Sequence, residues 1–276
     1  EEDGEEGFGG GLAAGDGRLF VTTGFGEVVA LDAADGEIAW RERFPAPFRS
    51  GPALAQGRLV AVTRDSRAFA LDAGDGSLLW RHRGVQADTG LLGGASPAIA
   101  GGAAILPYPS GELVALELSS GRRAWSAVMT GGRRGLARAA ITDLSGDPVV
   151  VGPNVIAANQ SGRLAAIEGN TGRRAWTRTL GATAPIWGAG ATVFLVSDTA
   201  VLMRIEAATG RSLWERALPA FEDPEDREDA IAYSGPVLVS GRLLLTDSLG
   251  NLRAHDAVTG EGEVVAEVPG GSVTGP

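Results

Sequence analysis

The sequence repeats a fixed interval between a proline and a later tryptophan, and this spacing constrains the fold more than any other feature. The interval is 28 residues in four copies and 29 in one, while the separation between copies varies from 9 to 23 residues. The pairs are Pro52–Trp80, Pro97–Trp125, Pro148–Trp176, Pro185–Trp214 and Pro236–Val264, with valine replacing tryptophan in the last. Units of constant length joined by loops of variable length indicate repeated structural modules.

Each unit contains four short runs of strand-forming residues. In residues 52–83 the runs are PALA, RLVAVT, AFALD and LLWRHR. Gly, Asp, Asn or Ser at the breaks is typical of strands joined by tight turns. A lone four-stranded sheet leaves both of its faces bare, whereas packing such sheets around an axis covers both. We therefore predict an all-β protein, a β-propeller of four-stranded antiparallel blades.

The units are expected to form one propeller domain over residues 1–276. The expected blades cover residues 11–40, 52–80, 97–125, 148–176, 185–214 and 236–264. Gly275 and Pro276 repeat the Gly-Pro pair that opens other units, so a further unit is expected to begin at residue 276. The chain is therefore interpreted as a fragment, with six blades of a larger ring.

The last turn of each unit has the strongest signature: an acid, a glycine four residues later and, in five copies, a tryptophan four residues after that. The glycines are expected to have positive φ, the acids to accept N–H bonds within the turn, and the tryptophans to pack between modules. Repetition on six modules favours these structural roles over metal ligation, catalysis, or a stacking row for sugars or bases. The motif residues are Gly36, Trp40, Gly76, Trp80, Gly121, Trp125, Gly172, Trp176, Gly210, Trp214 and Gly260, and the acids are Asp32, Asp72, Glu117, Glu168, Glu206 and Asp256.

Composition argues against several classes of function. The absence of cysteine excludes disulfides and any cysteine-based nucleophile or metal site. His82 and His255 lie in strand regions of different units, so no histidine metal cluster or Ser-His-Asp arrangement is evident. A net charge of −10 disfavours nucleic acid, and no apolar run is long enough to cross a membrane. We predict a protein that is not an enzyme and holds no cofactor or metal.

The repeat A-x-[DE]-x-x-[TDS]-G-x-x-x-W resembles the motif of quinoprotein-type propellers. A fuller resemblance, to the BamB family, is carried by GRLFVTTGFGEVVALDAADGEIAW, TGLLGGASPAI, ITDLSGDPVVV and SGRLAAIEGNTGRRAW. GFGEVVALDA and GLLGGASP are most similar to forms from α-proteobacteria. The resemblance implies an eight-bladed periplasmic scaffold of the outer-membrane β-barrel assembly machinery. It also implies an N-terminal lipid anchor outside this chain.

The same resemblance implies partners and contact residues. The partners would be the POTRA domains of the barrel-inserting subunit, with unfolded outer-membrane proteins as further candidates. In the family the contacts centre on a leucine and an arginine before a Ser-Pro, and on two acids before a Pro-Val-Val. Here Leu91 keeps the leucine while Leu92 stands at the arginine position. Asp143 keeps one acid while Ser145 stands at the other.

The long connections between units are the other candidate binding elements. Residues 81–96, 126–147 and 215–235 make the same kind of connection and are expected on one face of the propeller. Arg133, Arg134 and Arg138 in the second loop either face an acidic partner patch or belong to an ordinary solvated loop. The acids of the third loop favour a solvated loop over a cation or basic-partner site, because they lack the spacing of a calcium loop. These acids are Glu222, Asp223, Glu225, Asp226, Glu228 and Asp229.

Two alternatives to a scaffold remain open from the sequence. One is a quinone-dependent dehydrogenase of the same propeller type. The other is a propeller that binds peptide or carbohydrate. Trp187 lies outside the repeat motif and either lines a central channel or packs in the blade.

Overall fold

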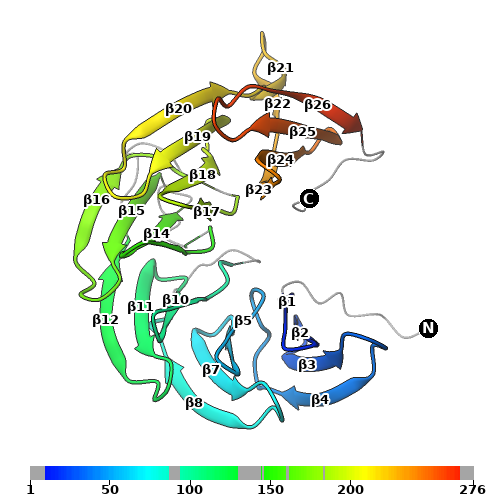
Figure 1. The fold of residues 1–276 in the computed structure, drawn as a ribbon, viewed down its shortest axis with the longest axis vertical. Coiled ribbons are helices and arrows are strands. Elements are labelled where there is room, and N and C mark those ends of the chain that lie inside the picture. Colours follow the sequence, from blue (N-terminus) through cyan, green and yellow to red (C-terminus); the bar gives the residue numbers. More distant parts are fainter. Residues whose placement is uncertain are drawn as a thin grey trace. The chain divides into compact units, whose positions relative to one another are not determined.

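The computed structural model describes residues 10–86, 94–129, 144, 146–159, 162–182 and 184–267. Within these residues the chain forms six four-stranded antiparallel sheets and a separate two-stranded hairpin (Figure 1). The chain divides into two compact units, which are described separately. Unit 1 comprises residues 1–129, 141–148 and 170–172, and unit 2 comprises residues 130–140, 149–169 and 173–276. Among the described residues no helix has the length and hydropathy needed to span a membrane.

Unit 1 contains three sheets in which each strand pairs with the next in the chain. The first sheet consists of β1 (Gly10–Gly15), β2 (Arg18–Thr23), β3 (Glu27–Asp32) and β4 (Ile38–Arg43). The second consists of β5 (Ala53–Ala55), β6 (Arg58–Val62), β7 (Arg67–Asp72) and β8 (Leu78–Arg83). The third consists of β9 (Ala98–Ala100), β10 (Ala103–Pro107), β11 (Glu112–Glu117) and β12 (Arg123–Val128). The first strands of neighbouring sheets, β1 with β5 and β5 with β9, contact each other.

Unit 2 repeats this arrangement and adds the hairpin. Its first sheet consists of β13 (Val149–Val151), β14 (Asn154–Asn159), β15 (Arg163–Glu168) and β16 (Arg174–Arg178). The next consists of β17 (Trp187–Ala189), β18 (Thr192–Val196), β19 (Val201–Glu206) and β20 (Ser212–Ala217). The last consists of β23 (Tyr233–Val239), β24 (Arg242–Asp247), β25 (Asn251–Asp256) and β26 (Gly262–Glu267). The hairpin, β21 (Phe221–Asp223) and β22 (Glu228–Ala230), precedes β23. Here too the first strands β13, β17 and β23 contact one another in order.

The four strands predicted in every unit are present, and in the second sheet the fourth strand coincides with the predicted run LLWRHR. In the second sheet the ladder continues three residues past Trp80, to the pair Arg67 and Arg83. The outermost strands end at Arg83, Val128 and Ala217, so the connecting loops are 84–97, 129–148 and 218–232. Each of these strands ends three residues after its motif tryptophan, so the loops begin three residues later than the predicted starts at residues 81, 126 and 215.

The last turn of each sheet has the predicted backbone. The six motif glycines have φ between +70° and +79°, the region that glycine enters without steric cost. The aspartates Asp32, Asp72 and Asp256 accept the N–H two residues ahead, at 2.7–2.9 Å. Glu117 and Glu206 depart from the prediction, because their longer side chains reach the hydroxyls of Ser120 and Thr209 at 2.8 and 2.5 Å.

The motif tryptophans pack between neighbouring sheets. Trp80 donates its indole N–H to the carbonyl of Leu118 at 2.8 Å. A Cβ added to Gly121 would lie 2.8 Å from the Trp80 ring, so the glycine leaves room for the indole. The same pairing places Trp40 against Gly76 and Trp125 against Gly172, both within unit 1, and Trp176 against Gly210 and Trp214 against Gly260 within unit 2. The glycine therefore serves both the turn and the contact between sheets.

A second repeated turn, between the second and third strands, was not predicted. In five sheets a short polar side chain accepts the backbone N–H four residues ahead, at 2.8–3.3 Å. The acceptors are Thr23, Thr63, Asn159, Ser197 and Asp247. These residues share an oxygen acceptor and little else, so a search by residue identity does not reveal the pattern.

The hydrophobic core lies between adjacent sheets. In unit 1, Phe20 and Phe48 pack with Leu59 and Leu71 between the first two sheets. Between the second and third, Val62 packs with Leu106, Tyr108 and Val114. Unit 2 has the same layers, for example Ile156 with Leu195 and Ile205. Burying such side chains contributes about 1.5–3 kcal/mol each, so the contacts between sheets dominate the stability of both units.

Candidate protein-interaction surface

All seven residues predicted to contact a partner lie outside the described residues. They are Leu91, Leu92, Arg133, Arg134, Arg138, Asp143 and Ser145. Their roles therefore stay predictions. The structure does describe the ends of the two loops that carry Leu91 and Asp143, and these ends belong to unit 1.

The ends of the two loops are joined by a hydrogen bond. The backbone N–H of Ser96 donates to Oδ1 of Asp147 at 2.6 Å, across 51 residues of sequence. Ala95, next to Ser96, and Leu144, three residues before Asp147, are buried. The loop stretches ending in Ser96-Pro97 and Asp147-Pro148 are thus held together at their bases, as a shared interaction surface would require.

Asp147 occupies an environment that resists ionisation. Burial raises the pKa of its carboxyl above the ordinary value, and the hydrogen bond from Ser96 offsets part of that rise. A charge-assisted bond to a backbone N–H is stronger than a neutral one, and it is stronger still away from water. In the sequence Asp147 is one of several acids in a loop, and its position before Pro148 does not indicate that it accepts the N–H of Ser96.

Arg49 contacts the loop between β8 and β9 at Gly94. It is 3% exposed, and its carbonyl accepts the N–H of Gly94 at 3.1 Å. A Cβ added to Gly94 would lie 1.8 Å from Nε of Arg49, so only glycine allows the loop to pass directly over the buried guanidinium. Arg49, in the loop between β4 and β5, therefore lies against Gly94, in the loop between β8 and β9.

The first loop leaves its sheet over a buried tyrosine. A Cβ added to Gly84 would lie 2.5 Å from the Tyr108 ring, and the Gly84 N–H donates to the carbonyl of Ser66 at 2.7 Å. Nδ1 of His82 lies 3.0 Å from the Tyr108 hydroxyl oxygen. Burial, followed by the charge of Arg123, lowers the pKa of His82, and burial raises the pKa of Tyr108. His82 thus lies in a strand, as predicted, and its ring meets Tyr108.

The acidic loop of unit 2, expected to be a solvated loop, contains a β-hairpin. Phe221 pairs with Ala230 and Asp223 with Glu228. The Asp223 carboxylate accepts the N–H groups of Glu225 and Asp226, which closes the turn. The acids project into solvent, and the described residues contain no cluster of three or more His, Cys, Asp or Glu suited to a metal. Whether this hairpin shares a face with the loops of unit 1 stays a prediction.

Two further residues singled out in the sequence have structural positions. Trp187 in β17 packs against the core between the last two sheets of unit 2. His255 in β25 is buried, with Nδ1 3.1 Å from the carbonyl oxygen of Gly260.

Comparison with solved structures defines the class of fold. BamB from Moraxella catarrhalis superposes with a TM-score of 0.80 over 96% of this chain and 78% of that chain, at 21% identity. Quinohemoprotein alcohol dehydrogenase from Comamonas testosteroni superposes with a TM-score of 0.64 over 98% of this chain and 68% of that chain, at 14% identity. Identities this low show the fold alone. The chain is an all-β protein with the propeller fold, as predicted.

Sequence comparison identifies the family. The model for "Outer membrane protein assembly factor BamB" matches residues 2–216. A protein of that name from Xanthomonas campestris pv. campestris is 43% identical over 195 residues, which cover 69% of this chain and 47% of that protein. Another, from Alteromonas naphthalenivorans, is 36% identical over 187 residues, covering 68% and 45%. The chain belongs to the BamB family, and it spans about half the length of these relatives. The predicted non-enzymatic class is confirmed, because this is a family of assembly factors.

Proposed function

We propose that this chain is a non-catalytic scaffold of the outer-membrane β-barrel assembly machinery. Its partners are the POTRA domains of the barrel-inserting subunit, bound through the loops that follow β8 and β12. The hydrogen bond between Ser96 and Asp147 is the observation that supports this surface. It ties together the bases of the two loops that carry Leu91 and Asp143, the residues that match the contact positions of the family.

The proposed contact combines an apolar and a charged part. Leu91 and Leu92 supply the apolar part, and Asp143 and Ser145 supply polar groups beside it. Arg133, Arg134 and Arg138 extend the surface toward acidic residues of the partner. Unfolded outer-membrane proteins are a further proposed ligand. The site of action is the periplasmic side of the outer membrane, with attachment through an N-terminal lipid.

Titration of the purified chain with the POTRA domains of its cognate assembly subunit tests this function. Leu91→Asp, Leu92→Asp and Asp143→Arg should each weaken binding about tenfold or more, because central contact residues carry most of the binding energy. Leu78→Asp and Glu261→Arg are matched controls at exposed positions that do not belong to the loops, and they should leave the affinity unchanged.

Two results would contradict the proposal. One is no binding of the POTRA domains by the unaltered chain. The other is equal weakening by the loop variants and their controls, which would assign the effect to charge or solubility instead of to the loops.

In the full-length gene, a signal peptide that ends in a lipidated cysteine is the expected finding for the proposed location.

A further inference from the structure

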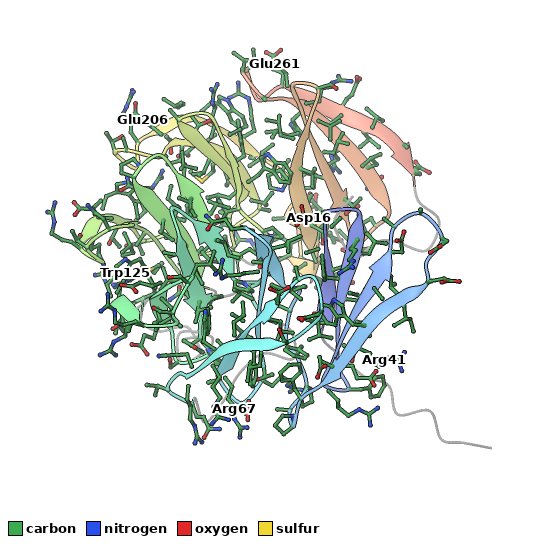
Figure 2. The ribbon with its side chains drawn as sticks, turned by 60° about the horizontal axis from the view of Figure 1, so that its bottom comes forward. Asp16, Arg41, Arg67, Trp125, Glu206 and Glu261 are labelled. Carbon is green, nitrogen blue, oxygen red and sulfur yellow. The ribbon has the colours of Figure 1, made fainter. Side chains whose placement is uncertain are left out.

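The second sheet of unit 1 carries a basic groove that the proposed POTRA contact does not use. The groove has a volume of about 520 Å³. It is lined by Pro45, Arg67, Phe69, Arg81, His82 and Arg83. Figure 2 labels Arg67, at the end of the sheet where β7 begins. This concentration of arginine is unexpected in a chain of net charge −10.

Strand register gathers the arginines on one face of the sheet. Arg67 lies directly opposite Arg83, and Phe69 lies directly opposite Arg81. Side chains two apart on a strand share a face, so these four point the same way. His82 borders the groove, but its ring turns to the opposite face of the sheet, where it meets Tyr108. Like charges directly opposite each other on antiparallel strands destabilise a sheet, so the Arg67 and Arg83 pair does not serve the fold.

Two of these arginines are available to a ligand. Asp65 pairs with Arg67, with 2.8 Å between Oδ2 and Nε. Arg81 and Arg83 are exposed, and among the described residues their side chains form no hydrogen bond or ion pair. Two guanidinium groups therefore face the groove with their donors open to solvent.

The floor and wall of the groove are apolar and firmly held. Phe69 is buried, and its ring centroid lies 4.6 Å from that of Phe44. Pro45, the next residue in the loop after β4, forms the wall. A ligand that fits this site has carboxylates for the arginines and carbon-rich surface for the phenylalanine and the proline.

We propose that this groove binds an extended, acidic segment of a partner protein with carboxylates at alternate positions. Residues two apart on a strand are separated by about 6.4–6.8 Å, so Arg81 and Arg83 match acids at positions i and i+2 of an extended chain. Guanidinium and carboxylate groups pair through two parallel hydrogen bonds, which favours arginine for this recognition. The proposal does not depend on the POTRA contact, which uses other residues.

Charge complementarity alone would also allow an anionic lipid surface. The position of the groove favours a peptide, because Phe69 lies at the bottom of a concave site beside Pro45. A narrow chain can reach this floor, whereas a planar layer of headgroups meets only the exposed ends of the arginines. Vesicle binding is therefore a test outcome that would contradict the proposal.

Fluorescence anisotropy with a labelled peptide tests the groove. The probe is Thr-Asp-Thr-Asp-Thr-Asp-Thr, compared with a peptide of the same charge whose aspartates are three residues apart and with a peptide that has Asn for Asp. The alternating peptide should bind most tightly, and its affinity should fall with added salt. R81S/R83S should weaken it about tenfold or more, since hydrogen bonds between charged groups are lost.

The control is R41S/R122S, which removes the same charge from exposed positions outside the groove; Arg41 is labelled in Figure 2. It should bind the peptide as the unaltered chain does, and equal weakening would overturn the proposal. The proposal would also be overturned if the unaltered chain did not bind the peptide. A third contradicting result is that the unaltered chain binds phosphatidylglycerol vesicles but no peptide, and that R81S/R83S loses the vesicle binding. The Tm of R81S/R83S should not fall, because a like-charge pair is removed. A fall would assign the arginines to the sheet and contradict the proposal.

Discussion

At the residue scale, single polar groups determine how the loops of unit 1 are held. Asp147 accepts the N–H of Ser96, while Gly94 passes over the buried Arg49. Each contact depends on one atom: an acceptor oxygen in the first case, and a missing Cβ in the second. Substitution at these positions therefore separates the geometry of the loops from the chemistry of their exposed side chains.

Asp147 gives a prediction that distinguishes its oxygen from its charge. Asp147→Ala removes the acceptor and leaves the Ser96 N–H unpaired, which should lower the free energy of unfolding by about 1–3 kcal/mol. Asp147→Asn keeps an acceptor oxygen without a charge in a buried site, so it should be at least as stable as the unaltered chain at about pH 7. Urea unfolding of the three proteins measures both effects, and equal losses in Asn and Ala would contradict the assignment.

The same residue predicts a dependence on pH. Burial raises the pKa of Asp147 in the folded chain above its value in the unfolded chain. The folded state therefore takes up a proton at higher pH than the unfolded state does. As pH falls from about 7 toward the pKa of the folded state, the unaltered chain should gain stability relative to Asp147→Asn. Urea titrations at about pH 7 and about pH 4.5 measure this change. If the unaltered chain instead lost stability relative to Asp147→Asn as pH falls, the prediction would be wrong.

At the element scale, the contact between sheets is the repeating unit of stability. A tryptophan from one sheet lies against the motif glycine of the next sheet, and its indole N–H donates to a carbonyl there, as Trp80 does with Leu118.

The acidic hairpin of unit 2 could not be predicted from its local sequence. Its residues have low strand propensity, yet Ala220 and Ile231 at its two ends pack with the core, and the Ile231 N–H donates to the carbonyl of Ala220 at 3.0 Å.

Trp80 tests the role of the sheet contacts. Trp80→Ala should lower the free energy of unfolding by about 3–5 kcal/mol, because it opens a cavity in a buried site. Trp80→Phe keeps a ring but loses the hydrogen bond to Leu118, so its loss should be smaller, about 1–3 kcal/mol. Leu79→Ala, on the exposed face of the same strand, is the control and should change stability by about 0.5 kcal/mol or less. A Trp80→Ala loss no larger than that of the control would refute the role.

At the scale of the whole molecule, one fold accommodates two kinds of protein. The chain superposes on a quinohemoprotein alcohol dehydrogenase, but its sequence belongs to the BamB family of assembly factors. A shared fold does not imply a shared function, because function depends on side chains placed on the fold. The single domain over residues 1–276 and the eight-bladed ring stay predictions.

Titration with pyrroloquinoline quinone and calcium separates the two kinds of protein. We expect no saturable change in the absorption spectrum of the quinone, because the chain belongs to a family of assembly factors. The spectrum of the quinone and calcium in buffer is the reference. A saturable change at one quinone per chain would revive the dehydrogenase interpretation.

The sequence by itself determined the strands, the turn glycines and the tryptophan contacts, because these depend on residues a few positions apart and recur in every unit. Tertiary structure alone decided which distant residues meet. Ser96 joins Asp147 across 51 residues, and Arg67 faces Arg83 through strand register. The acidic run around Asp226 became a hairpin for the same reason. Local chemistry recurs in the pattern of residues, whereas a contact between loops depends on the packing of whole sheets and leaves no periodic trace in the chain.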